Sequence, residues 1–271
     1  MTEGFAGVLE LEPTGEDRFA AHQTADAPQL YGGLAMGWML RAAGATVGDD
    51  LQPHSLHATF LRGGRHGVAT ELVVDRRRDG RAFATRHVEL HQEGRLVATM
   101  TASFHTGEDG PDWHEPPAGL SDTGPEELLA TPARVPGTRW VDLRHADQGH
   151  ADGTIPFLRH SIHPYWVRIT GPVPDEPRFH ASALAFLSDY LVVLSAAPPG
   201  RGVEPGTRMV TLDHGLWLHR PTRVDGWLHV TSDPISTSGG RGTCRGLIHD
   251  RDGRLVASFV QEVLHRAGVP G

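Results

Sequence analysis

One carboxylate stands in a segment that carries no other charge. Residues 181–195 read Ala-Ser-Ala-Leu-Ala-Phe-Leu-Ser-Asp-Tyr-Leu-Val-Val-Leu-Ser, and Asp189 is their only charged residue. Burying an ionised carboxylate is costly unless it is paired or hydrogen-bonded. Asp189 is therefore either the partner in a structural ion pair or a reactive carboxylate with a raised pKa. We favour the second interpretation because perturbed carboxylates concentrate at functional sites.

An internal repeat singles out a second polar residue. Residues 94–99, Gly-Arg-Leu-Val-Ala-Thr, return at 253–258 as Gly-Arg-Leu-Val-Ala-Ser. In this alignment Gln261 takes the place of Ala102. Duplicated units commonly keep packing residues in both copies and chemistry in one, so we expect Gln261 to contribute hydrogen bonds to a site. A polar residue at a sheet edge is the alternative.

A third polar feature is the segment Ser236-Thr237-Ser238-Gly239-Gly240-Arg241-Gly242. Small hydroxyl residues and glycines can bring backbone amides and hydroxyl groups close to a ligand. The same composition is also typical of an ordinary turn. By itself it therefore favours the plain loop.

The elements that must position these residues come in two sets. Two further matches support the repeat: 79–81 with 239–241, and 57–61 with 214–218. Each copy has one helix candidate, 33–47 and 181–195, that is apolar nearly all round and hence buried. Four antiparallel strands are predicted after each helix: 55–62, 68–77, 82–91 and 95–105, then 209–219, 226–232, 243–249 and 254–265. Short strands at 8–12, 18–22, 140–144 and 164–169 would widen the two sheets.

This pattern predicts an α+β fold in which an antiparallel sheet wraps one buried helix, twice over. We expect an N-terminal unit at 1–105 and a C-terminal unit at 139–271. Residues 106–138 contain four Pro/Gly dipeptides or Pro pairs and are predicted to be an irregular connector between the two units.

Composition narrows the chemistry further. The chain of 271 residues has no lysine and no asparagine, and its net charge is −8. Schiff-base lysines and Walker-A lysines are thereby excluded. The acidic balance argues against nucleic-acid binding, and no apolar run reaches the ~18 residues of a membrane span. The single cysteine, Cys244, fits a reducing cytoplasm. No motif indicates a metal or a cofactor.

Taken together, these motifs resemble acyl-CoA thioesterases of the TesB type (thioesterase II), which are double hotdog proteins. The resemblance covers nearly the whole chain. In the first half it rests on the segments 31–33, 56–62 and 78–86. In the second half it rests on Phe-Leu-Ser-Asp-Tyr at 186–190, Leu-Asp-His-Gly-Leu-Trp-Leu-His-Arg-Pro at 212–221, the Gly-Gly-Arg-Gly of 239–242, and the Gln-Glu of 261–262.

The resemblance implies two tandem hotdog repeats, each an antiparallel sheet around a central helix, and hydrolysis of acyl-CoA to a free acid and CoA. It places the family's catalytic Asp at Asp189 and its Gln at Gln261. A Ser or Thr hydroxyl helps them to orient the attacking water, and a backbone amide at a helix N-terminus holds the oxyanion, for which Gly33 is our candidate.

The chain departs from the family pattern at two places. Where we expect the family's Ser or Thr, it reads Asp-Pro-Ile at 233–235, so the hydroxyl is expected from Ser236 or Thr237. Leu34 replaces the usual Gln after Gly-Gly. These differences leave two alternatives open: a hydratase or dehydratase acting on an acyl thioester, and a non-catalytic module that binds acyl-CoA or an acyl carrier.

Substrate contacts follow from the missing lysines. The phosphates of CoA would have to bind arginine, histidine or backbone amides. Arg81 and Arg241 are candidates, although a structural ion pair is equally compatible with them.

His57 and His214 align in the two copies, so we expect both to pack or to hydrogen-bond rather than to catalyse. A double hotdog chain is already an internal pseudo-dimer, and a homodimer of such chains is compatible with it.

Overall fold

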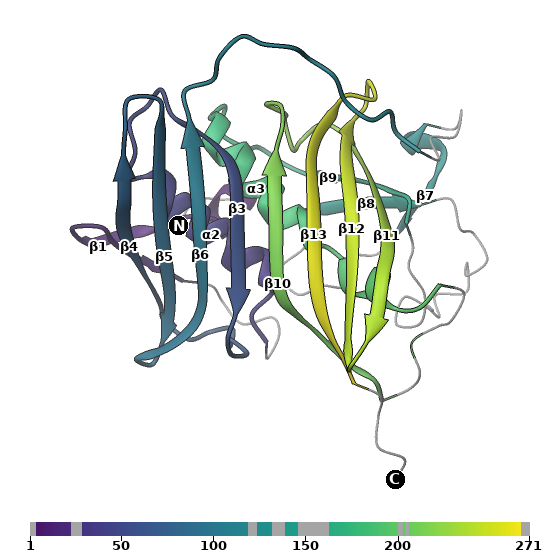
Figure 1. The fold of residues 1–271 in the computed structure, drawn as a ribbon, viewed down its shortest axis with the longest axis horizontal. Helices are drawn as coiled ribbons and strands as arrows, with labels where there is room; N and C mark the ends of the chain where they lie inside the picture. Colours follow the sequence, from purple (N-terminus) through teal and green to yellow (C-terminus); the bar gives the residue numbers. More distant parts are fainter. Residues whose placement is uncertain are drawn as a thin grey trace.

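The computed structural model describes residues 4–22, 29–118, 124–131, 139–145, 163–199, 203 and 206–266. Its described strands form one 13-stranded sheet in the order β1-β2-β4-β5-β6-β3-β10-β13-β12-β11-β9-β8-β7 (Figure 1). All pairings are antiparallel. The two halves of the chain meet where β3 pairs with β10 in the middle of this sheet.

The first half contains α1 (Phe5–Val8), β1 (Glu12–Gly15), β2 (Arg18–Ala21), α2 (Gly32–Gly44), β3 (Gln52–Phe60), β4 (Thr70–Asp79), β5 (Phe83–Gln92) and β6 (Arg95–His105). The strand expected at 8–12 is wrong, because α1 ends there and β1 begins at Glu12. The reason is packing: the ring of Phe5 lies edge-on against Phe186, with centroids 5.1 Å apart, and Trp38 Nε1 donates to the carbonyl of Val8.

The second half contains a 3₁₀ turn at Pro125–Glu127, β7 (Leu129–Thr131), β8 (Val141–His145), β9 (Tyr165–Ile169), α3 (Pro177–Ser188), a 3₁₀ helix at Val192–Ala196, β10 (Arg208–Leu218), β11 (Leu228–Ser238), β12 (Arg241–Asp250) and β13 (Leu255–Arg266). Within the expected connector, residues 106–118 arch over one end of the sheet (Figure 1). The connector is not irregular throughout, since β7 pairs with β8; its residues 119–123 and 132–138 lie outside the described part.

The helix expected at 181–195 stops earlier, at Ser188, and begins at Pro177. Proline is favoured in the first turn of a helix because it needs no hydrogen-bond acceptor there. At the other end Leu191 adopts a left-handed φ of 60°, and the hydroxyl of Tyr165 donates to the carbonyl of Tyr190 at 2.6 Å. The turn places Asp189 directly after the last helical residue, at the C-cap, instead of in mid-helix.

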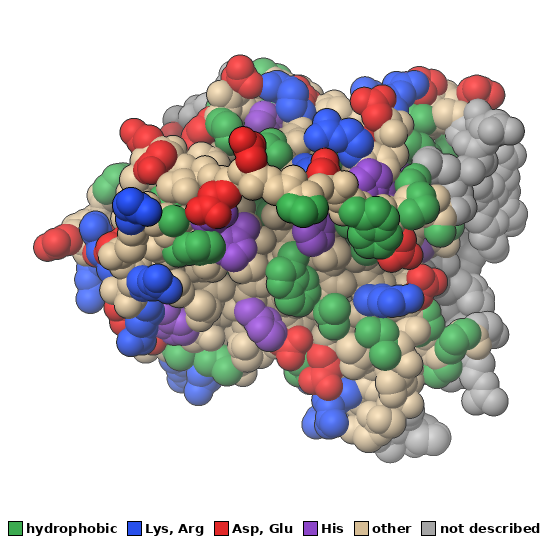
Figure 2. Space-filling model, turned by 45° about the horizontal axis from the view of Figure 1, so that its top comes forward, with side chains coloured by type: hydrophobic (Ala, Val, Ile, Leu, Met, Phe, Trp, Pro, Cys, Tyr) green, Lys and Arg blue, Asp and Glu red, His purple; other side chains and the backbone are tan. Residues whose placement is uncertain are grey.

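The two long helices pack against each other on one side of the sheet, which curves around them (Figure 1). Gly33 and Gly37 allow the close approach, because a Cβ on Gly33 would lie 2.3 Å from the carbonyl oxygen of Phe186. This is the double hotdog arrangement that the sequence predicts. Acidic and basic side chains are mixed over the face shown in Figure 2. Of the described helices, none is long and apolar enough to cross a membrane.

Candidate active site

Asp189 is a buried carboxylate at the junction of the two helices. Only 5% of the surface of Asp189 is exposed. Burial raises its pKa to about 7, and hydrogen bonds from the Gly33 backbone N–H and the Thr211 and Gln261 side chains oppose the rise. The carboxylate therefore changes protonation state near neutral pH, which suits a group that must take up a proton and give it back.

The N-terminus of α2 faces this carboxylate. The helix begins at Gly32, directly after Tyr31, whose hydroxyl donates to the carbonyl of Phe186 at 2.8 Å and holds the start of α2 against α3. A Cβ on Gly32 would lie 2.8 Å from Oδ2 of Asp189, so a larger residue would crowd the carboxylate. The positive end of the helix dipole supports the ionised form of Asp189.

Two neighbouring strands supply the polar partners of Asp189. Thr211 on β10 donates its hydroxyl hydrogen to Oδ1 of Asp189 at 3.3 Å. Gln261 on β13 is completely buried, and its Nε2 donates to Oγ1 of Thr211 at 2.9 Å. The three side chains form one connected chain of hydrogen bonds.

A β-bulge makes this geometry available. Thr211 pairs with Val263 and Asp213 with Glu262, so Leu212 is an extra residue on β10. In a regular strand, residues three apart point to opposite faces. The bulge shifts that alternation, and both Thr211 and His214 reach the side chain of Gln261.

A cleft of about 630 Å³ opens next to the carboxylate. Asp189, Thr211 and Gly32 lie in its wall together with two arginines, Arg62 and Arg208. Most of the remaining wall is apolar: Leu30, Tyr31, Ala35, Phe60, Leu61, Val97, Leu191, Val193, Val210 and Leu212. An apolar cleft with a few convergent polar groups is typical of a small-molecule site.

The structure places two of the expected site residues away from this cleft. Ser236 is exposed, and the hydroxyl of Thr237 donates to the carbonyl of Ala196; neither residue lines this cleft. The hydroxyl next to Asp189 belongs to Thr211 instead, the only Ser or Thr within the predicted strand 209–219.

Arg81 and Arg241 also lie away from the cleft. Both are exposed on hairpins, and Arg241 pairs with Glu262 at 2.9 Å. The cleft arginines are Arg62 and Arg208. Gly33 does not line the cleft, and a hydrogen bond from its N–H lowers the pKa of Asp189. The backbone of its neighbour Gly32 does line the cleft.

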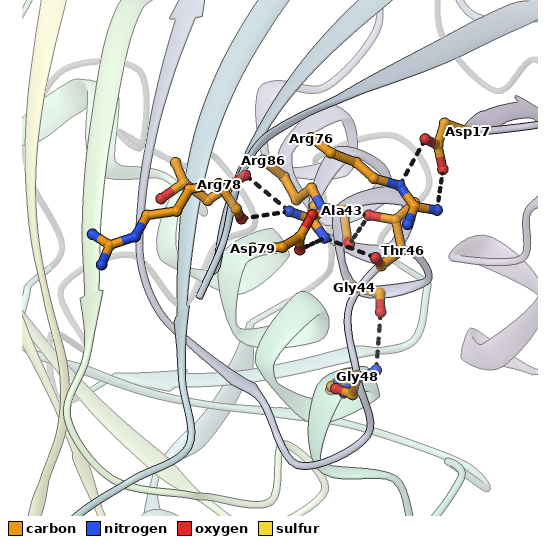
Figure 3. Close-up of polar contacts among 11 residues, drawn as sticks. Asp17, Ala43, Gly44, Thr46, Gly48, Arg76, Arg78, Asp79 and Arg86 are labelled. Carbon is orange, nitrogen blue, oxygen red and sulfur yellow. Dashed lines mark hydrogen bonds and ion pairs between the residues drawn. The ribbon is translucent and has the colours of Figure 1, made fainter. Parts of the chain in front are cut away.

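The opposite ends of the two helices meet at an equivalent place, where the described residues form a helix cap instead of a second site. In the first half, Arg86 stands opposite Ala102, the residue that replaces Gln261. Its buried guanidinium donates to the carbonyl of Thr46 at 2.9 Å and to Asp79 at 2.5 Å, just beyond the end of α2 (Figure 3). Arg178 at the start of α3 donates to the carbonyl of Gly44 at 2.9 Å. The polar groups here cap a helix and stabilise the fold.

Within the described ranges, no group of three or more His, Cys, Asp or Glu side chains is arranged to hold a metal ion. Cys244 is buried opposite Gln261 on β12, and burial raises its pKa to about 12. Such a thiol is a poor nucleophile.

The chain is similar to known acyl-CoA thioesterases over most of its length. Residues 21–105 match the family of acyl-CoA thioesterase N-terminal domains, and residues 108–265 match the corresponding C-terminal domains. Human acyl-coenzyme A thioesterase 8 is 30% identical over 280 residues, which are 94% of this chain and 86% of that protein. Acyl-CoA thioesterase 2 of Haemophilus influenzae is 28% identical over 88% of each chain. The acyl-CoA thioesterase II TesB2 structure from Mycobacterium marinum is 30% identical, covers 98% of both chains and has a TM-score of 0.77.

Proposed function

Because this chain belongs to the TesB-like acyl-CoA thioesterase II family, we propose that it hydrolyses acyl-CoA thioesters with a water molecule oriented by Asp189, Thr211 and Gln261. The observation that carries this proposal is the carboxylate with a pKa of about 7 in the wall of an apolar cleft, hydrogen-bonded to Thr211. The apolar wall can bind the acyl chain. The carboxylate can hold the water molecule that attacks the thioester carbonyl.

The reaction needs one base and no covalent enzyme intermediate. Ionised Asp189 accepts a proton from the water as its oxygen forms a bond to the thioester carbon. The tetrahedral intermediate then collapses, the carbon–sulfur bond breaks, and the leaving thiolate takes the proton back from Asp189. The products are the free acid and the thiol of CoA, and Asp189 is again ionised.

The start of α2 provides for the oxyanion. The first N–H groups of a helix have no partner within the helix, and they point toward negative charge at its N-terminus. The backbone amide of Gly33 already donates a hydrogen bond to Asp189. We assign the oxyanion to the amide of Gly32, whose backbone lines the cleft.

We expect Arg62 and Arg208 to bind the phosphates of CoA, because arginine pairs readily with phosphate oxygens. Replacing either by Ala should raise KM for acyl-CoA about fivefold, as expected for an exposed ion pair of about 1 kcal/mol, with little change in kcat. KM is measured by thiol release at low ionic strength, where exposed pairs are least screened.

Two controls make this prediction specific. Arg81→Ala and Arg241→Ala should leave KM unchanged, since neither residue lines the cleft. An acyl thioester of N-acetylcysteamine, which has no phosphate, should be hydrolysed equally by the native and the Arg variants. An equal rise in KM for the phosphate-free substrate would refute phosphate binding by these arginines.

The activity itself is tested by incubating the purified protein with acyl-CoAs of several chain lengths and trapping the free thiol. Release well above background for at least one chain length is expected. Loss of the absorbance of an α,β-unsaturated acyl-CoA without thiol release would indicate a hydratase instead. Tight binding by calorimetry without turnover would indicate a binding module.

A further inference from the structure

A buried histidine lies behind Gln261, and neither of these two side chains lines the cleft. His214 on β10 is completely buried. Its Nδ1 lies 2.8 Å from Oε1 of Gln261, and its Nε2 lies 3.0 Å from Oγ of Ser188. It thereby connects Gln261 to the last residue of α3, next to Asp189.

The hydrogen-bond partners of Gln261 fix the direction of its bond with His214. Burial lowers the pKa of His214 to about 4, so near neutral pH one ring nitrogen donates and the other accepts. The Nε2 of Gln261 already donates to Thr211, which leaves Oε1 of Gln261 facing the histidine. Nδ1 of His214 therefore carries the hydrogen. Nε2 accepts, and it shares the single hydroxyl hydrogen of Ser188 with the carbonyl of Ala185, which lies 2.9 Å from the same hydroxyl oxygen.

The two halves of the sheet differ at this point by a pair of residues. In the second half His214 stands directly opposite Gln261. In the first half Leu56 stands directly opposite Ala102. The histidine and the glutamine are thus present together in the half with the site and replaced together by apolar residues in the other half.

His57, the sequence match of His214, has a different environment. It is exposed, whereas His214 is buried and hydrogen-bonded, as expected for that histidine. The face of His214 stacks on Phe259, with ring centroids 5.5 Å apart and planes 19° apart. Together with Ser188, this contact fixes the plane of the imidazole ring.

Resting on the proposed function, we infer that His214 is a positioning residue that keeps the amide nitrogen of Gln261 turned toward Thr211 and Asp189. With the amide turned over, its oxygen would face Thr211 and compete with Asp189 for the hydroxyl hydrogen. The hydrogen bonds from Thr211 and Gln261 that favour ionised Asp189 would then be lost or weakened.

The protonation of Asp189 can report this change. Tyr31, Tyr165 and Cys244 are the titratable groups whose charges couple to Asp189, and burial raises the pKa of each, so they are neutral near pH 7. His57 is the titratable side chain that acts on His214 through its charge. A shift in the acid limb of kcat/KM between variants therefore reflects the hydrogen bonds to Asp189.

The test compares His214→Asn with His214→Leu. The two side chains have the same size, but only the Asn amide nitrogen can occupy the position of Nδ1 and donate to Gln261. We expect His214→Leu to lower kcat about tenfold, as for a broken hydrogen bond in a buried network, with KM nearly unchanged and the acid limb moved to higher pH. His214→Asn should retain kcat within about threefold, because the donor is kept, and leave the limb in place.

Equal losses in both variants with an unmoved acid limb would overturn the inference. A second measurement needs neither variants nor activity: ¹⁵N NMR of the histidine-labelled protein distinguishes the tautomers, and His214 must carry its hydrogen on Nδ1. A hydrogen on Nε2 would overturn the inference even in an active enzyme. Absence of thiol release by the wild type would instead refute the proposed function.

Discussion

Asp189→Asn is expected to lower kcat for acyl-CoA hydrolysis by about 10²–10⁴-fold, the usual contribution of a general base, while making the folded protein more stable at alkaline pH. The amide keeps the shape of the carboxylate and can still accept a hydrogen bond from the Gly33 amide. It cannot take a proton from water. If activity falls while stability rises, the loss of activity is due to the missing base and not to unfolding of the protein.

The sign of the stability change follows from the pKa of Asp189. Burial raises that pKa from 3.8 to about 7 in the folded state. The unfolded chain therefore releases the proton at lower pH, and the free energy of unfolding falls as pH rises from about 4 to about 7. Above pH 7 the full cost of ionised Asp189 is present, and Asn removes it.

Denaturant unfolding at pH 4, 6 and 8 measures this effect. The variant should match the wild type at pH 4 and be more stable by a few kcal/mol at pH 8. Substrate hydrolysis is measured on the same preparations. Activity close to that of the wild type would contradict the role of Asp189 as a base, whatever the stability.

Thr211→Val is expected to lower kcat about 10²-fold, since it removes the hydroxyl that donates to Asp189 and accepts from Gln261. Valine has nearly the same shape, so the bulge at Leu212 should be retained. The loss of one donor should also move the acid limb of kcat/KM to higher pH.

Thr211→Ser is the matched control, because it keeps the hydroxyl and removes only the methyl group. It should retain kcat within about fivefold, as expected when the hydrogen bonds persist. Ser236→Ala and Thr237→Ala should leave kcat unchanged, since neither residue lines the cleft. Loss of activity in Ser236→Ala or Thr237→Ala, with an active Thr211→Val, would reverse this assignment.

Much of the fold could be predicted because hydrophobic patterns and the repeat agree. The strands around the hairpin turns at 93–94 and 250–253 are within two residues of their predicted bounds. The early end of α3 was not predictable from hydrophobicity, because residues 190–195 remain apolar on leaving the helix. Their turn depends on a tertiary hydrogen bond, from Tyr165 to the carbonyl of Tyr190.

The candidate site, like the fold, was predictable from the sequence only in part. Asp189 was selected because a charge in an apolar segment has an energetic cost that needs an explanation. Gln261 was selected because the other copy of the repeat has alanine. Thr211 was missed, since the bulge that turns it inward has no signature in the strand's own sequence. Arg241 lies beside the Ser/Gly segment and Arg81 is its counterpart in the repeat, and neither fact indicates where a hairpin lies relative to a cleft.

The most direct test of this account is the pH dependence of kcat/KM for thiol release from acyl-CoA between pH 5 and 9, because kcat/KM reports the ionisation of the free enzyme. With Asp189 as the base and its pKa at about 7, the logarithm of kcat/KM should level off above that pH and fall by one unit per pH unit below it. The residual rate of Asp189→Asn should lack this limb. A wild-type profile that stays flat down to pH 5 would contradict the central role of ionised, buried Asp189.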